Sequence, residues 1–119
     1  MKRLLAVLII MLMLSPAQAA VYHFFNGEQL AEAGLEWEKS KTNSKDVDRL
    51  LISNYAGYVG GIFDHLSEKQ HICAPDEITK GEVLDVISNY LENNRSGLEN
   101  AGSVLVEKAL YKKFSCTKK

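Results

Sequence analysis

The sequence has 119 residues, of which 14 are basic and 15 are acidic, so its formal net charge at neutral pH is −1. This length predicts a single domain with a modest hydrophobic core. The slight acidic excess argues against nucleic acids and anionic membranes as partners, because both attract strongly basic surfaces.

The N-terminal residues have the three-part pattern of an export signal. Lys2 and Arg3 precede an unbroken apolar run at positions 4–14, and the small-x-small sequence at positions 17–19 is typical of a cleavage site. The run is much shorter than the roughly 20 residues of a membrane-spanning helix, so no membrane anchor is expected after cleavage. We expect removal of residues 1–19 to leave a periplasmic domain, residues 20–119, with a net charge of −3.

Helical patterns follow in chain order. Residues 27–39 are rich in helix formers, and the polar linker after them ends at Ser44, a good N-cap for the next helix. Residues 45–67 have the strongest helical pattern. Their apolar residues recur three or four positions apart, at Val47, Leu50, Leu51, Tyr55, Tyr58, Val59, Ile62, Phe63 and Leu66. This spacing predicts a helix with one buried face.

Two further helices are predicted towards the C-terminus. Thr79 and Glu82 match a capping box at the start of one helix, which continues through an apolar stripe at 83–91. Ser96 and Glu99 form a second capping-box pattern, before a last helix that reaches position 110. Because no alternation typical of strands is present, the sequence predicts an all-α bundle of about four helices.

Three glycines, Gly57, Gly60 and Gly61, lie inside the strongest helical segment. Each costs about 1 kcal/mol relative to alanine in a helix interior. They indicate either a kink or a face that another backbone approaches closely. Asp64 lies late in the same segment, where it could cap, bind a partner or face water, and base rates for aspartate favour the last.

The two cysteines, Cys73 and Cys116, predict one disulfide in an oxidising compartment. In the chain-entropy model, such a loop closure stabilises a domain by roughly 4 kcal/mol. Two other uses of these residues are less favoured. A cysteine hydrolase needs a free thiolate beside a base such as His71, His65 or His23. A zinc site from His65, His71 and both cysteines lacks the paired spacing of zinc motifs.

The remaining polar residues do not predict catalysis. Asp46 with Asp48, and Asp76 with Glu77, are better explained as acidic residues near helix starts. Four tyrosines are expected to pack in the core with their hydroxyl groups at its edge: Tyr55, Tyr58, Tyr90 and Tyr111. The residues therefore predict no enzyme, no metal and no cofactor.

Short motifs between residues 50 and 116 carry a family resemblance. Residues 55–64 read YAGYVGGIFD, which fits a GYV-x-G-[IV]-x-D helix that begins at Gly57 and Tyr58, contains Gly60 and ends at Asp64. A C-x-P motif ends at Pro75, and a T-x-G-[QE]-V helix start follows at 79–83. The closing motifs are Tyr90-Leu91, Ala109-Leu110 and Phe114-Ser115-Cys116, with Ser115 in place of the usual proline. This ordered set resembles the Rap/Tai family of periplasmic immunity proteins from type VI secretion systems.

The resemblance implies a small helical protein, often a homodimer, that binds a peptidoglycan amidase effector and covers its active site. Interfaces depend on a few anchor residues, and loops are their usual location. We expect the partner to contact the segment Ser67, Glu68, Lys69, Gln70 and His71, or the turn at 93–96.

Two other functions remain open for a small, exported, helical protein with two cysteines. One is a periplasmic acid-stress chaperone, which exposes apolar surface when its carboxylates are protonated. The other is an envelope binding protein that has no toxin as partner. The GYV-x-G helix and the C-x-P spacing favour the immunity function over both.

Overall fold

The computed structural model describes residues 22–116. They form the helices α2 (Gly27–Ser40), α3 (Arg49–Glu68), α4 (Lys80–Asn93) and α5 (Gly102–Lys113), and a short 3-10 helix, η1 (Arg95–Gly97). No strand occurs among these residues apart from an isolated bridge between Asn26 and Ala101. The predicted all-α bundle is confirmed, and the predicted signal peptide lies outside the described residues.

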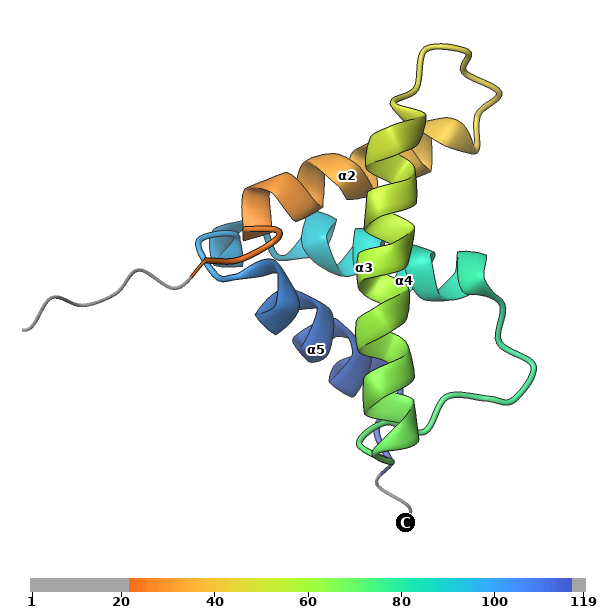
Figure 1. Cartoon of the computed structure of the whole chain (residues 1–119), viewed down its shortest axis with the longest axis vertical. Helices are drawn as coiled ribbons and strands as arrows, with labels where there is room; N and C mark the ends of the chain where they lie inside the picture. The colour runs from red at the N-terminus through yellow and green to blue at the C-terminus, as the bar shows by residue number, and fades with distance from the viewer. Residues whose placement is uncertain (1–21, 117–119) are drawn as a thin grey trace, which may run out of the picture.

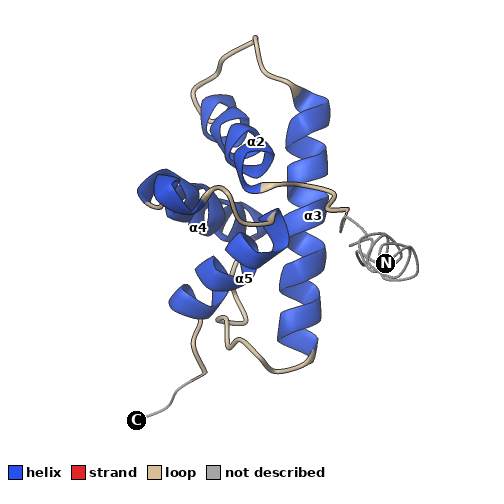
Figure 2. Ribbon diagram, turned by 90° about the vertical axis from the view of Figure 1, so that its left-hand side faces the viewer, coloured by secondary structure: helices blue, strands red, loops and turns tan. Residues whose placement is uncertain are grey.

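The longest helix, α3, forms one side of the molecule by itself (Figure 1). The other three helices pack against its inner side, with α4 between α2 and α5 (Figure 2). As a result, α3 has one covered face and one open face. None of the helices within residues 22–116 is both long and apolar enough to cross a lipid bilayer.

The hydrophobic core lies between α3 and the other three helices. Its largest fully buried side chains are Tyr55, Leu30, Leu66, Ile87, Leu105, Leu110, Val59 and Val106. The buried hydroxyl group of Tyr55 donates a hydrogen bond of 2.8 Å to the carbonyl oxygen of Leu84 in α4. Full burial of an aliphatic side chain contributes about 1.5–3 kcal/mol, so this core is the main source of stability.

Capping boxes fix the starts of two helices. In α2, Gln29 N donates to Asn26 Oδ1 (2.8 Å) and Asn26 N donates to Gln29 Oε1 (3.1 Å). In α4, Thr79 N donates to Glu82 Oε2 (2.7 Å) and Glu82 N donates to Thr79 Oγ1 (3.2 Å). This reciprocal pair confirms the predicted capping box. Hydrogen bonds from the Thr79 backbone and hydroxyl group hold the pKa of Glu82 below its usual value.

The start of α3 differs from the prediction. The helix begins at Arg49 rather than Lys45, and its N-cap is Asp48, whose carboxylate accepts a hydrogen bond of 2.9 Å from Leu51 N. The predicted cap, Ser44, lies in the linker. The backbone N–H of Asp48 donates to the Glu36 carboxylate of α2 at 2.9 Å, and this contact between distant residues favours Asp48 as the cap.

The second predicted capping box, of Ser96 and Glu99, is wrong. Residues 95–97 form η1, and α5 begins at Gly102 without a side-chain cap. The N–H of Gly102, which no side chain caps, donates a hydrogen bond of 2.8 Å to the carbonyl oxygen of Phe25. The start of α5 is therefore satisfied by a backbone segment far away in the sequence, which no local motif could indicate.

Several apolar residues that were predicted to lie in the core are at the surface. Of the four tyrosines, only Tyr55 is fully buried, and Tyr111 is exposed. The side chain of Leu50 is 72% exposed, although it belongs to the apolar pattern of α3. The reason is geometric, because the other helices cover only one side of α3 (Figure 2), and the exposure of Leu50 shows that it does not lie on that side.

Candidate functional site

The outer face of α3 carries most of the motif residues. Gly57, Gly60 and Gly61 have open space around them, since a Cβ atom at any of the three would meet nothing within 4 Å. Asp64, one turn after Gly60, is exposed. Neither expectation for the glycines is met within the described residues, because α3 runs straight through them in Figures 1 and 2 and no segment of the chain approaches them.

A groove of about 560 Å³ runs between this face and the start of α4. Gly57, Gly60 and Gly61 line one wall, while Ile78 and Val83 line the other. We call it the glycine groove. Its rim also carries Asp64 from α3 and Lys80 from α4, so that a largely apolar hollow has one negative and one positive group at its edge.

Tyr58, the remaining motif residue of α3, belongs to a different contact. Its ring packs against Phe24 at a centroid distance of 5.9 Å and against Phe25 at 5.0 Å. Phe25 is buried, whereas Phe24 is 64% exposed. Tyr58 therefore anchors the segment before α2 onto α3 and is not part of the glycine groove.

The segment between α3 and α4, residues 69–79, is fixed tightly at its start. Lys69 caps α3, and Gln70 follows in the left-handed region with φ of 57°. The N–H of His71 donates to the carbonyl oxygen of Leu66 at 2.8 Å, which closes a Schellman-type turn. Ile72 is then buried in the core, so the loop turns back into the molecule immediately after His71.

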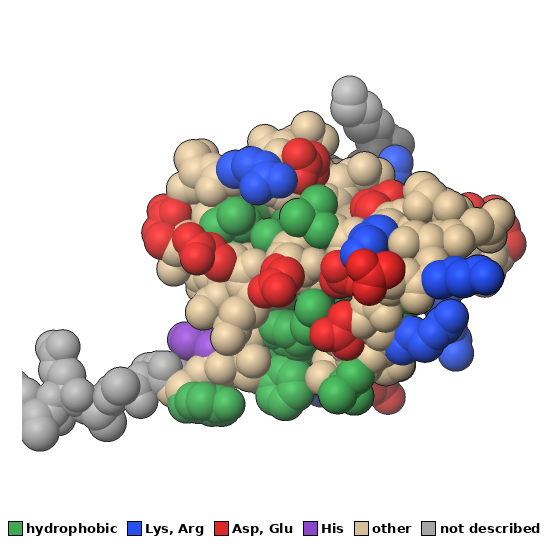
Figure 3. All heavy atoms as spheres, turned by 90° about the horizontal axis from the view of Figure 1, so that it is seen from above, with side chains coloured by type: hydrophobic (Ala, Val, Ile, Leu, Met, Phe, Trp, Pro, Cys, Tyr) green, Lys and Arg blue, Asp and Glu red, His purple; other side chains and the backbone are tan. Residues whose placement is uncertain are grey.

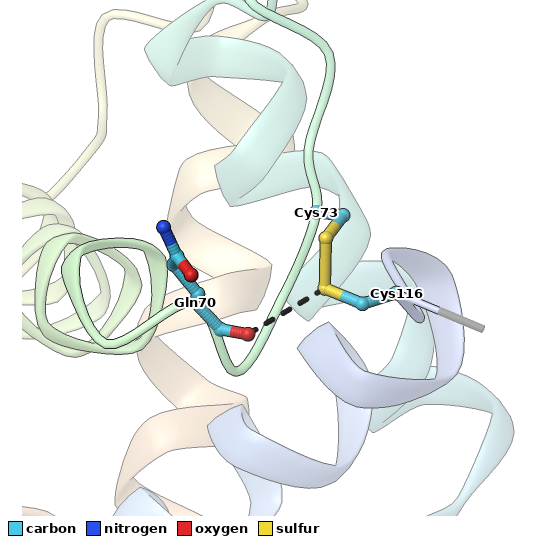
Figure 4. Close-up of a disulfide and its surroundings, with 3 residues drawn as sticks. All are labelled: Gln70, Cys73 and Cys116. Atoms are coloured by element: carbon cyan, nitrogen blue, oxygen red, sulfur yellow. Dashed lines mark hydrogen bonds between the residues drawn. A yellow bond between two sulfur atoms is a disulfide. The ribbon is translucent and has the colours of Figure 1, made fainter. Parts of the chain in front are cut away.

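A disulfide holds the middle of this loop. Cys73 is bonded to Cys116, and the Cα atoms of the two residues are 4.9 Å apart. The N–H of Cys73 donates to the carbonyl oxygen of Phe114 at 2.8 Å, beside the covalent link. Figure 4 shows the Cys116 sulfur pointing towards the Gln70 carbonyl oxygen, at 3.7 Å. The loop is thus attached to the C-terminal end of α5 by covalent and hydrogen bonds.

The residues predicted to bind a partner lie at the end of α3 and at the start of this loop. Glu68, Lys69, Gln70 and His71 are exposed. Ser67 is still within α3, and its hydroxyl oxygen is buried without a hydrogen-bond partner among the described residues. The other predicted contact region, at 93–96, lies at the C-terminal end of α4, away from the end of α3 (Figure 1). The structure therefore keeps the two regions apart.

Pro75, the last residue of the C-x-P motif, lies on the exposed part of the loop. Its carbonyl oxygen accepts a hydrogen bond of 3.1 Å from the N–H of Ile78, which forms a turn before α4. Asp76 and Glu77, inside this turn, are exposed. The turn leads directly into the Thr79 capping box, so the motif shapes the far end of the loop.

A polar network joins α2 to α4 and so fixes the position of α4. Asp85 accepts hydrogen bonds of 2.8 Å from both Trp37 Nε1 and Lys41 Nζ. Partial burial raises the pKa of Asp85, but the bonds from Lys41 and Trp37 outweigh burial and leave that pKa below its usual value. Ser88 Oγ donates to Glu38 Oε1 at 2.6 Å in the same interface.

Burial also raises the pKa of Tyr55 in α3, which keeps its hydroxyl group neutral.

The disulfide argues against the two less favoured functions, a cysteine hydrolase and a zinc site. Both sulfur atoms are in the bond, so neither is the thiolate that a cysteine hydrolase needs or that zinc would bind. His23, His65 and His71 are all exposed. Within residues 22–116 no group of three or more histidine, cysteine or acidic side chains is placed to hold a metal ion.

The sequence does not predict the glycine groove. It indicates the motif glycines of one wall, but Ile78, Lys80 and Val83 follow the loop after α3, and no pattern in the sequence indicates that they face α3. Leu50 had a usable signal. It lies seven residues before Gly57, a spacing of about two helical turns, which places it on the glycine face.

Comparison with known proteins identifies the family. The family model for Rap1a immunity proteins matches residues 26–116, which is almost the whole described part of the chain. No curated protein matches the sequence. The match covers the motif helix, the disulfide-anchored loop and the last helix together. The chain belongs to the Rap1a family of immunity proteins.

Proposed function

We propose that this protein is a periplasmic immunity protein that binds a peptidoglycan amidase effector of a type VI secretion system and occludes its active site. The observation that carries the proposal is the family match over residues 26–116, since members of an immunity family protect by binding an effector. The amidase as target and the type VI system as its source come from the motif resemblance. The proposal concerns binding alone and involves no chemical step.

The exposed segment Glu68–His71, with the loop that follows it, is the contact region we propose. A surface that is already ordered loses little conformational entropy on binding, and this favours affinity. The Schellman-type turn at Gln70 and the link from Cys73 to Cys116 provide such order. An exposed segment that is firmly held can contact the open cleft of an enzyme without first becoming ordered.

The surface charge supports a basic partner surface. The chain after the predicted signal has a net charge of −3. Figure 3 shows acidic side chains among hydrophobic ones, with basic side chains gathered mainly at one side, on the face at the opposite end of the molecule from Glu68–His71. An acidic inhibitor associates faster with a positively charged cleft, and this advantage decreases as salt concentration rises.

Protection of living cells tests the proposal. Cells that export an amidase effector to the periplasm should survive when they also export this protein, and should lyse when its residues 1–19 are deleted. The variant Glu68→Lys should protect less well, because it places a positive charge in the contact region that faces the proposed basic cleft. The matched control is Glu107→Lys, an exposed charge reversal of the same sign on α5.

Two results would contradict the proposal. One is lysis despite export of the folded protein, for every amidase effector of the same genome. The other is protection that does not depend on export. Failure to protect combined with suppression of client aggregation at low pH would favour the acid-stress chaperone instead.

A further inference from the structure

The charges of this protein are divided unevenly along the chain. Residues 108–119 contain five lysines and no acidic residue, whereas residues 20–107 contain seven basic and 15 acidic residues. The two parts therefore carry net charges of +5 and −8. The slight acidic excess of the whole chain conceals a basic segment, and such a segment attracts partners of opposite charge.

Three of these five lysines lie on α5 and are exposed: Lys108, Lys112 and Lys113. None of the three forms an ion pair with another residue in the range 22–116. Lysines near the C-terminal end of a helix interact favourably with its partial negative charge, which accounts for their place on α5. Their ammonium groups nevertheless remain in water, where they can bind an external anion.

A hollow of about 320 Å³ lies between the last turns of α4 and the last turn of α5. Its lining on α4 includes Asn89, Tyr90 and Asn93, which the helical repeat places on one face of the helix. Its lining on α5 includes Lys112 and Lys113. The described part of the chain contributes no acidic side chain to this hollow, which we call the lysine hollow.

The side chains of the lysine hollow suit a sugar or peptide that has free carboxylates. A lysine ammonium group binds a carboxylate through a charge-assisted hydrogen bond. An asparagine amide both donates and accepts, so it can pair with the hydroxyl and amide groups of amino sugars and peptides. The amide of Asn94 already donates to the Tyr90 carbonyl oxygen at 2.7 Å, whereas the amides of Asn89 and Asn93 have no bond to the rest of the described chain.

We propose that the lysine hollow binds peptidoglycan itself, a polymer of acetylated amino sugars and short peptides with free carboxylates, and holds this protein on the cell wall. The proposal goes beyond the binding of an effector and shares with it only the predicted export to the periplasm. Cys116, three residues after Lys113, is bonded to Cys73 in the loop of the proposed effector contact. A protein held on the wall by this end therefore keeps that loop close to the polymer that an amidase would cut.

The polymer fits this surface better than an anionic membrane does. Helices that lie on membranes present large apolar side chains beside their lysines. Within positions 108–113 of α5, the one exposed large hydrophobic residue is Tyr111, with 40% exposure. Leu110 and Ala109 are buried in the core. The amides of the lysine hollow add hydrogen bonds to sugars and peptides, which an acyl chain cannot form.

Co-sedimentation of the mature protein with purified peptidoglycan sacculi, without effector, tests the proposal. The wild type should pellet with the sacculi, and less of it should pellet at high salt, because salt screens the attraction between lysine and carboxylate. The double variant Lys112→Glu, Lys113→Glu should lower the apparent affinity about tenfold. The matched control is Lys45→Glu, which reverses an exposed charge in the linker between α2 and α3 and should bind as the wild type does.

A second variant separates a site of defined shape from simple attraction between charges. Asn89→Ala combined with Asn93→Ala keeps the net charge and should weaken binding about fivefold, because two hydrogen bonds to the polymer are lost. Sacculi whose carboxylates have been converted to neutral amides should no longer bind the wild type. Circular dichroism should show that the variants are folded, since all the substituted side chains are exposed.

Four results would overturn the inference. They are no pelleting of the wild type at low salt, equal pelleting of the lysine variant, equal pelleting of the asparagine variant, and pelleting with phosphatidylglycerol vesicles but not with sacculi. The two proposals can fail separately. Binding to sacculi without inhibition of an effector would contradict the proposed function alone, whereas inhibition without binding to sacculi would contradict this inference alone.

Discussion

Glycines occur in this protein in two opposite environments. At the starts of α2 and α5, the chain meets itself so closely that Gly27 and Gly102 have no room for a side chain. A Cβ atom on Gly102 would lie 2.7 Å from the carbonyl oxygen of Phe25. On the outer face of α3, by contrast, a Cβ atom on Gly57 or Gly61 would meet no other described part of the chain within 4 Å.

The difference shows that one residue type serves two kinds of contact. Gly27 and Gly102 allow a backbone crossing inside the chain, where Gly27 N donates to Asn100 O at 2.9 Å and Gly102 N to Phe25 O at 2.8 Å. Gly57 and Gly61 serve no contact within the described residues. Their cost to the helix, about 1 kcal/mol each, therefore has no internal compensation. The inner contacts therefore stabilise the fold, whereas the glycines on the outer face of α3 do not.

The largest expected effect comes from removing the disulfide, which is also a contact within the chain. Replacing both cysteines, Cys73→Ser and Cys116→Ser, should lower the free energy of unfolding by roughly 4 kcal/mol, because the unfolded chain is no longer constrained. Urea denaturation of the two proteins measures the loss. Alkylation and mass spectrometry of freshly exported wild-type protein should detect no free thiol, and two labelled thiols would contradict the disulfide.

The next effect tests the glycines at the helix starts. Gly102→Ala should lower the free energy of unfolding by about 2–3 kcal/mol, because the new methyl group meets the backbone of Phe25, which cannot easily move. Thermal and urea denaturation measure the change. A neutral result would mean that the crossing of the two backbones is looser than the structure shows.

The opposite sign is expected on α3. Gly57→Ala should raise the stability of the monomer by up to about 1 kcal/mol, since alanine is the better helix former and the space is open. The measurement is thermal denaturation of the wild type and the variant at equal concentration. Destabilisation of the monomer would show that another part of the chain packs on this face.

The smallest effect concerns the polar network between α2 and α4. The pKa of Asp85 lies below its usual value of 3.8, so this carboxylate stabilises the fold above that pH and stops doing so as the pH falls below it. The effect is small because the group is partly exposed to solvent. Asp85→Asn should reduce stability near neutral pH, and its difference from the wild type should disappear in acid. A difference that is constant with pH would contradict this assignment.

Local patterns predicted most of the fold. The periodicity of residues 45–67 and the capping box of Thr79 and Glu82 depend on neighbours within one or two turns, and both indicated the correct helices. The errors arose where distant contacts decide. Glu36 of α2 selects Asp48 over Ser44 as the cap of α3, and Phe25 replaces the predicted box before α5.

The candidate site was only half predictable for the same reason. The GYV-x-G-[IV]-x-D motif indicated the glycines and Asp64, and the C-x-P motif indicated the loop that contains Cys73 and Pro75. Helical periodicity identifies an apolar residue such as Leu50 but not which side of a helix remains uncovered. Similarly, the second wall of the glycine groove depends on how α4 lies against α3, which is set by the packing of the whole bundle.

The central claim is that this protein protects by binding an amidase effector, and a titration of enzyme activity tests it most directly. Purified effector, at a concentration well above the dissociation constant, is mixed with increasing amounts of this protein, and hydrolysis of peptidoglycan fragments is measured. The account predicts that activity falls linearly and reaches zero at a fixed molar ratio. Full activity at a large excess of folded protein, or complete loss at a small fraction of the effector concentration, would contradict it.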